Sequence, residues 1–206
     1  MLYRIVYIFF KLFFKLFFHL DIYGVENIPK TGGAIVAPNH RSFLDIPIMG
    51  VALPRRMRSL GKKEVISESR LGWLYQMLGG IPLDLDRTDL KGLRNAINVL
   101  EQGSLLLVFP EGTRSLTKEV GPVKKGVVFL SFKASVPIVP VGIVGAGKAL
   151  HKTSKMIKFA HLVVVFGKPI KLWELFDPKG NSFYEKSTKC LRKEIKKCVE
   201  LTEEKL

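Results

Sequence analysis

Apolar residues recur along the chain in two different periods. Short, nearly continuous apolar runs bounded by Gly, Pro, Asn or charged residues are typical of buried strands. Such runs are "DIYGVEN", "AIVAPN", "RSLGKK", "GGIPLDL", "SLLLVFP", "PIVPVGIV" and "LVVVFGKPI". Between them, apolar residues three or four apart predict helices over 44–53, 71–78, 90–102, 125–134 and 183–203. Strands that alternate with helices predict an α/β fold with a mixed, largely parallel sheet covered by helices.

The last predicted helix is amphipathic. Leu191, Ile195 and Val199 fall on one face and Lys and Glu residues on the other, which indicates a packing role. The helix also carries the two cysteines, Cys190 and Cys198. Their spacing along a helix separates the Cα atoms by roughly 12 Å, which is beyond disulfide reach. We therefore expect reduced thiols in a protein that faces the cytosol.

The N-terminal segment "MLYRIVYIFFKLFFKLFF" is apolar but carries Arg4, Lys11 and Lys15 at helical spacing, with His19 at the edge of that basic face. A spanning helix needs about 20 mostly apolar residues and tolerates internal charges poorly. No small-residue cleavage site of a signal peptide follows. We predict that residues 1–20 form a helix in the membrane interface and that residues 21–206 form one domain. A core helix and a short re-entrant insertion are the alternatives.

The chain of 206 residues is strongly basic. Its 33 Lys and Arg residues against 18 Asp and Glu residues give a formal net charge of +15. This excess predicts a polyanionic partner, and nucleic acid, an anionic membrane surface and phosphorylated small molecules all fit it. Charge alone does not choose among them, but the apolar N-terminal segment favours the membrane surface.

Candidate chemistry follows four of the predicted strands, at the carboxyl ends where parallel sheets present functional loops. The segments there are "NHRSFLD", "GKKE", "DR" and "PEGTRS". In the first, His40 and Asp45 taken alone are more typical of a surface histidine beside a helix-capping carboxylate than of a catalytic pair. In the last, Arg114 can grip a phosphate with two parallel hydrogen bonds, and Gly112 permits close backbone approach. A turn with a local Glu–Arg pair is the alternative.

Two further cations follow strands. Lys62 lies in "GKKE" and Arg87 ends "GGIPLDLDR". A solvated charge is the alternative for Lys62, and pairing with Asp84 or Asp86 is the alternative for Arg87.

Taken together, these blocks resemble the glycerolipid acyltransferase superfamily. "NHRSFLD" is similar to its NHx4D block, "GGIPLDLDR" to the second block, "FPEGTRS" to the third and "VPIVPVGI" to the fourth, and they occur in the family's order across residues 39–143. The similarity is greatest to the 1-acyl-sn-glycerol-3-phosphate acyltransferases. Asp84 and Asp86 depart from the usual apolar or aromatic residues before Arg87. The resemblance implies that residues 21–206 are an acyltransferase domain.

The resemblance also implies a reaction. A fatty acyl group moves from a thioester, acyl-CoA or acyl carrier protein, to the free hydroxyl of lysophosphatidate (1-acylglycerol 3-phosphate), giving phosphatidate in phospholipid synthesis. His40 acts as general base, and Asp45, one helical turn further on, orients its imidazole. The residues implied at the acceptor's phosphate are Lys62, Arg87, Glu111, Gly112, Thr113 and Arg114, with Glu111 positioning Arg114 or the glycerol hydroxyl. The sequence has no G-x-S-x-G motif, so we expect direct attack without an acyl-enzyme, and neither cofactor nor metal ion.

Other interpretations stay open. The acceptor can be glycerol 3-phosphate or another lysophospholipid, and a non-enzymatic basic protein that binds membrane surfaces explains the charge but not the four blocks. We do not expect nucleic acid as a partner. The expected location is the cytoplasmic face of the cell membrane, monotopic or peripheral through the N-terminal helix. "GIVGAGKA" approximates a phosphate loop, but Ala149 stands where Ser or Thr binds magnesium, so a glycine-rich turn after a strand is expected.

Overall fold

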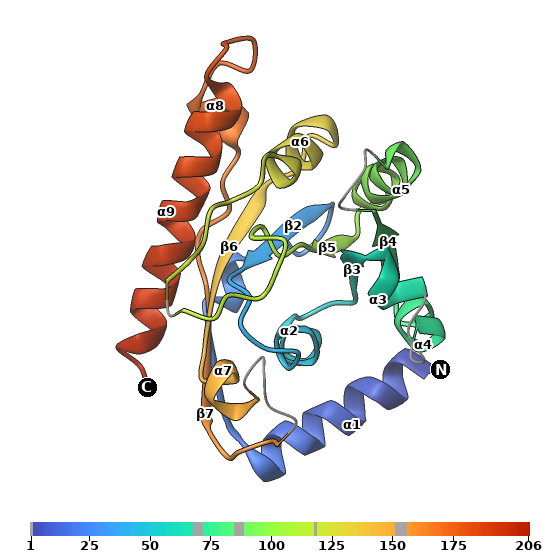
Figure 1. Cartoon of the computed structure of the whole chain (residues 1–206), viewed down its shortest axis with the longest axis vertical. Helices are drawn as coiled ribbons and strands as arrows, with labels where there is room; N and C mark the ends of the chain where they lie inside the picture. The colour runs from blue at the N-terminus through green and yellow to red at the C-terminus, as the bar shows by residue number, and fades with distance from the viewer. Residues whose placement is uncertain (1, 68–71, 85–88, 118, 151–155) are drawn as a thin grey trace.

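One seven-stranded sheet organises the residues that the structure, a computed structural model, describes: 2–67, 72–84, 89–117, 119–150 and 156–206 (Figure 1). The strand order is β1-β7-β6-β2-β5-β3-β4. The strands are β1 His19–Tyr23, β2 Ala34–Pro38, β3 Met57–Lys62, β4 Gly80–Leu83, β5 Leu105–Leu107, β6 Ile138–Val144 and β7 His161–Phe166. Neighbouring strands run parallel except β6 and β7. The predicted mixed, largely parallel sheet is confirmed.

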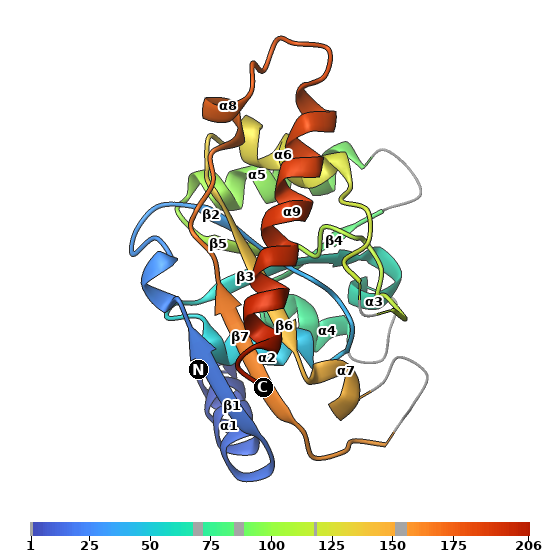
Figure 2. The same cartoon turned by 90° about the vertical axis from the view of Figure 1, so that its left-hand side faces the viewer.

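Helices cover both faces of this sheet (Figure 1 and Figure 2). On one face lie α1 (Leu2–Phe17) and α2 (Asp45–Ala52). On the other lie α5 (Leu90–Glu101), α6 (Lys125–Lys133) and α9 (Phe183–Glu203). The shorter helices are α3 Lys63–Ser67, α4 Gly72–Met77, α7 Ala146–Ala149, α8 Leu172–Leu175 and the 3-10 helix η1 Val25–Asn27.

The central strand β2 explains why the strands are unbroken apolar runs in the sequence. All five of its residues are buried. Ala34 and Val36 join the core beneath α1 and α2, whereas Ile35 and Ala37 join the core beneath α5, α6 and α9. Successive side chains of a strand point to opposite faces. A strand with helices on both sides is therefore apolar throughout.

Most predicted elements are present, with ends shifted by a few residues. β1 begins at His19, earlier than its sequence run suggests, because it pairs in register with β7 from His161 onward. The short helices α3, α7 and α8 were not predicted. Each has four or five residues, which is too short for a periodic pattern to emerge.

Helix α1 packs on the domain and also exposes apolar surface. Phe14 is almost wholly buried in the core shared with α2. The exposed large apolar side chains of α1 are Ile5, Ile8, Phe9, Leu12, Leu16 and Phe17. Arg4, Lys11 and Lys15 are exposed as well, whereas His19 belongs to β1 and not to the helix. Among the described residues, no helix is both long enough and apolar enough to cross a membrane.

The predicted packing face of α9 is confirmed. Leu191, Ile195 and Val199 are buried, and both cysteines are free thiols. Burial raises the pKa of Cys198 to about 11, which makes this thiol a poor nucleophile near neutral pH.

Candidate active site

The loops that follow parallel strands meet at one edge of the sheet. β2, β5, β3 and β4 are neighbours in that order and run in the same direction. Their carboxyl ends therefore lie together. The backbone N–H of Ser115 donates to the carbonyl of His40 at 2.8 Å, which ties the loop after β5 to the loop after β2. The candidate chemistry of the sequence is thus gathered at this edge.

His40 and Asp45 form a hydrogen-bonded pair. His40 Nδ1 lies 2.8 Å from Asp45 Oδ2. The same oxygen accepts backbone N–H groups of Arg41 at 2.7 Å and Ser42 at 2.8 Å, and the Asp45 side chain is only 1% exposed. Because the carboxylate accepts at Nδ1, the neutral imidazole carries its proton there. Nε2 is then the basic nitrogen.

A tight turn brings the side chains of His40 and Asp45 together, although the residues are five positions apart. The expectation that Asp45 lies one helical turn after His40 is wrong, because α2 begins only at Asp45. The backbone N–H of Asp45 bonds to the carbonyl of Ser42 at 3.3 Å, and the carboxylate folds back over the turn. The charge therefore sits in the first turn of α2, where the helix dipole favours an anion.

The loop after β5 supports His40 from two sides. The Phe109 ring stacks on the imidazole, with centroids 3.7 Å and planes 21° apart. Glu111 accepts the backbone N–H of His40 on one carboxylate oxygen and that of Gly121 on the other, both at 2.9 Å. Both oxygens are thereby engaged with the main chain. We assign Glu111 to bracing this loop and not to direct contact with phosphate.

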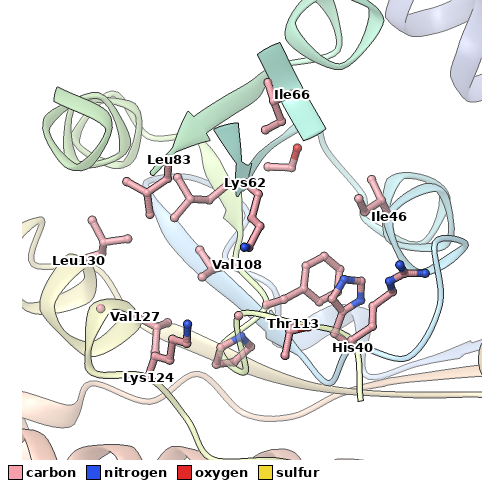
Figure 3. Close-up of a pocket in the computed structure, with 18 of the residues that line it drawn as sticks. His40, Ile46, Lys62, Ile66, Leu83, Val108, Thr113, Lys124, Val127 and Leu130 are labelled. Carbon is pink, nitrogen blue, oxygen red and sulfur yellow. The ribbon is translucent and has the colours of Figure 1, made fainter. Parts of the chain in front are cut away.

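A cavity of about 310 Å³ opens beside His40 (Figure 3). Its wall is largely apolar but contains three cations, and for these we call it the polar cavity. Its polar lining residues are His40, Ser59, Lys62, Tyr75, Thr113, Arg114 and Lys124. In Figure 3, Lys62 reaches in from the end of β3 and Lys124 from the segment before α6, toward the space beside His40 and Thr113. Three cations thus share a cavity with one basic imidazole, an arrangement that favours an anionic ligand.

Arg114 lies flat against an aromatic ring in the wall of this cavity. Its guanidinium carbon is 3.5 Å from the centroid of Phe43, within cation–π range. Tyr75 lines the same cavity; burial raises the pKa of its phenol, and the charge of Arg114 opposes that shift. The contact with Phe43 therefore holds the guanidinium of Arg114 in the cavity wall.

Gly112 is required by its backbone conformation. Its φ of 72° lies in the left-handed region, and a Cβ there would meet Lys124 Cε at 2.7 Å. Lys124 was not among the predicted site residues. The sequence shows only the run "VKKG" there, and nothing in that run indicates which of its two lysines reaches the cavity.

The remaining predicted residues have different outcomes. The structure gathers around the polar cavity His40, Lys62, Gly112, Thr113 and Arg114, with Asp45 behind His40. Arg87 lies outside the described residues. Asn39 was missed: its side-chain amide donates to the carbonyl of Ile143 at 3.0 Å and accepts its N–H at 2.8 Å. These two hydrogen bonds attach the loop after β2 to β6.

An apolar cavity of about 300 Å³ adjoins the polar one. It lies between α1, α2, β3 and α4. The two cavities share Phe43, Ile46, Ser59 and Tyr75, and α1 contributes to the apolar one Tyr3, Val6, Tyr7 and Phe10. The N-terminal helix is therefore a wall of the site as well as a surface element.

The glycine-rich segment "GIVGAGKA" forms the end of β6 and the short helix α7, as expected for a turn after a strand. Gly145 has a φ of 89°, and a Cβ there would collide with the carbonyl oxygen of His161. Close packing of the chain therefore accounts for this glycine.

Comparison with known proteins agrees with this architecture. A family model described as "Acyltransferase" matches residues 19–144. The chloroplastic 1-acyl-sn-glycerol-3-phosphate acyltransferase of Brassica napus is 33% identical over 154 residues, 73% of this chain and 44% of that protein. The enzyme of that name from Bacillus subtilis is 29% identical over 73% of each chain. The present chain thus spans less than half the length of the Brassica relative.

A solved structure extends the similarity to nearly the whole chain. The crystal structure of the 1-acyl-sn-glycerophosphate acyltransferase PlsC from Thermotoga maritima matches with a TM-score of 0.77 and 30% identity, over 96% of this chain and 78% of that one. The segment matched by the family model begins at the first residue of β1 and ends at the last residue of β6. Every strand that carries a site loop lies inside it, and the chain belongs to the acyltransferase family.

Proposed function

We propose that this protein acylates lysophosphatidate with a fatty acyl thioester, producing phosphatidate. The observation that carries the proposal is the pair His40–Asp45 at a cavity lined by cations and joined to an apolar cavity. A lysophosphatidate molecule needs the same three features: a base for its hydroxyl, cations for its phosphate and an apolar surface for its chain.

The reaction proceeds by general-base catalysis. His40 Nε2 removes the proton from the acceptor hydroxyl as its oxygen attacks the thioester carbonyl carbon. Asp45 holds Nδ1–H and stabilises the imidazolium that forms. The tetrahedral intermediate then breaks its C–S bond, and the imidazolium returns the proton to the thiolate. No acyl-enzyme forms and no cofactor takes part; the acyl donor, acyl-CoA or acyl carrier protein, is a substrate.

The acceptor's phosphate is held by side chains of the polar cavity. Arg114, oriented by its stack on Phe43, offers a guanidinium fork, and Lys62 and Lys124 supply point charges. Gly112 and Thr113 lie beside Arg114 on the same loop. We retain Arg87 as a proposed phosphate ligand on the strength of the sequence block alone.

Helix α1 holds the site at the membrane. We propose that residues 1–20 dock on the cytoplasmic face of the cell membrane, without spanning it, and that residues 21–206 carry out catalysis. The exposed apolar residues of α1 would enter the interface while Arg4, Lys11 and Lys15 meet lipid phosphates. A membrane-resident acceptor then reaches the apolar cavity along α1, which forms one wall of that cavity.

Charge reversal on α1 tests this docking. Lys11→Glu combined with Lys15→Glu should weaken binding to anionic vesicles at least about tenfold, because each interfacial Lys contributes about 1 kcal/mol. Binding to neutral vesicles should change little. Lys186→Glu with Lys189→Glu makes the same charge change on exposed positions of α9 and is the matched control. Unchanged co-sedimentation of the α1 variant would indicate a core helix only.

The identity of the acceptor is tested by assaying the two candidate acceptors side by side. Lysophosphatidate and glycerol 3-phosphate are each assayed with acyl-CoA and with acyl carrier protein, and thiol release is measured. We expect turnover to depend on lysophosphatidate, because its acyl chain can occupy the apolar cavity beside α1. Glycerol 3-phosphate has no chain to place there. Efficient acylation of glycerol 3-phosphate with none of lysophosphatidate contradicts the proposal.

A further inference from the structure

Two histidines and an aspartate converge where α1 enters the sheet. His19 and His161 are the first register pair of the parallel strands β1 and β7, which lie side by side in Figure 2. Asp21 follows His19 by two residues and therefore points to the same face of the sheet. Parallel pairing thus places two imidazoles and one carboxylate together from positions about 140 residues apart in sequence.

The ligand atoms of this cluster point at one another. Asp21 Oδ2 lies 2.9 Å from His161 Nε2 and 3.3 Å from His19 Nε2. The three ligand atoms all lie within 4.8 Å of one another, and the imidazole rings meet edge to face with centroids 4.6 Å apart. A tetrahedral zinc ion has bonds of about 2.0–2.1 Å, which separates its ligand atoms by roughly 3.3 Å. The two separations from Asp21 Oδ2 are close to this value, and rotation of the exposed His19 side chain adjusts its distance from His161.

We propose that His19, Asp21 and His161 bind one divalent transition-metal ion, with zinc the best match. Two imidazole nitrogens and one carboxylate oxygen are a donor set that favours zinc over magnesium or calcium, which prefer oxygen ligands. The side chain of His19 is 71% exposed, which leaves the fourth coordination position open to water.

The site would act on structure and not on the acyl transfer. None of the three side chains lines the polar or the apolar cavity. His19 lies two residues after the end of α1, where Phe17 stacks on Phe159 with centroids 6.3 Å apart. A bound ion would join the start of β1 to the start of β7 and so fix the position of α1. This proposed site differs from the expectation of no metal ion.

The test is zinc binding by untagged protein in detergent micelles, after removal of metal with a chelator. Titration against a chromophoric competitor should give one zinc ion per chain, and cobalt in its place should produce visible absorption bands. His19→Gln and His161→Gln should each weaken zinc binding at least about tenfold, as loss of metal-site partners does. The side chain of His19 is exposed and that of His161 is partly exposed, so the circular dichroism spectra should match the wild type.

Two controls address other donors in the chain. His40→Gln removes the second His–Asp pair, and Cys190→Ser removes a partly exposed thiol; zinc affinity should persist in both. Zinc should also raise the wild-type Tm, since a ligand of the folded state stabilises it, and this rise should vanish in His161→Gln. Equal zinc affinity of wild type and His161→Gln overturns the proposal, as does an affinity that falls only in His40→Gln or Cys190→Ser.

Discussion

His40→Ala is expected to lower kcat for acyl transfer by about a thousandfold, within the range that general-base catalysis contributes. This corresponds to roughly 4 kcal/mol of lost transition-state stabilisation. The loop should keep its shape, because His40 meets Glu111 and Ser115 through its backbone and not through its ring. Thiol release from acyl-CoA with lysophosphatidate measures the effect, and circular dichroism checks the fold.

Asp45→Asn is the graded partner of that variant, with a smaller expected loss of kcat. A carboxamide oxygen can still accept the N–H groups of His40, Arg41 and Ser42, but it no longer supplies charge to the imidazolium. A neutral amide oxygen accepts these three bonds more weakly than a carboxylate does, so the substitution should cost about 1–3 kcal/mol of folding stability. Tm therefore falls in Asp45→Asn.

Vesicle binding separates an enzyme from a membrane-binding protein. Both variants should bind anionic vesicles like the wild type, because neither residue belongs to α1. Near-normal turnover of His40→Ala would refute the general-base mechanism and leave the membrane-binding alternative standing.

Arg114→Ala is expected to raise KM for lysophosphatidate by roughly ten- to a hundredfold, because a hydrogen bond to a charged group contributes about 1.5–3 kcal/mol. Arg114→Lys should recover only part of this, since an ammonium lacks the planar fork and the stack on Phe43. Initial rates over a range of acceptor concentrations measure the effect. KM for the acyl donor should change little.

An acceptor without phosphate isolates the contact. With a monoacylglycerol in place of lysophosphatidate, wild type and Arg114→Ala should react at similar low rates, because the group that Arg114 binds is missing. Lys171→Ala removes a positive charge from an exposed position beside α8 and should leave KM unaltered. An equal KM effect with both acceptors would mean that Arg114 serves packing and not phosphate binding.

Much of the fold could be predicted from local patterns of apolar residues in the sequence. The apolar runs of β2, β5 and β6 predicted buried strands because helices cover both faces of the sheet there. The face of α9 formed by Leu191, Ile195 and Val199 was readable from helical spacing. Parallel strands also explain why "NHRSFLD" and "FPEGTRS" meet, since their carboxyl ends share one edge.

Which polar groups contact one another, in contrast, was decided by tertiary structure. Glu111 was expected near the phosphate, yet its oxygens take two main-chain N–H groups that only the folded loops bring together. Lys124 reaches the polar cavity because Gly112 leaves room for it. The amphipathic pattern of α1 was compatible with both interface and core, and the structure shows one face packed and another exposed.

The sequence by itself determined the strands, the packing face of α9 and the four blocks, because each depends on residues close in the chain or on a rule that holds for every parallel sheet. Only tertiary structure decided which polar atoms meet. His19 and His161 become neighbours through the register of β1 with β7, and no local pattern encodes that register. A hydrogen bond or a metal ligand depends on distances of a few ångströms between distant segments, and those distances exist only once the whole sheet has formed.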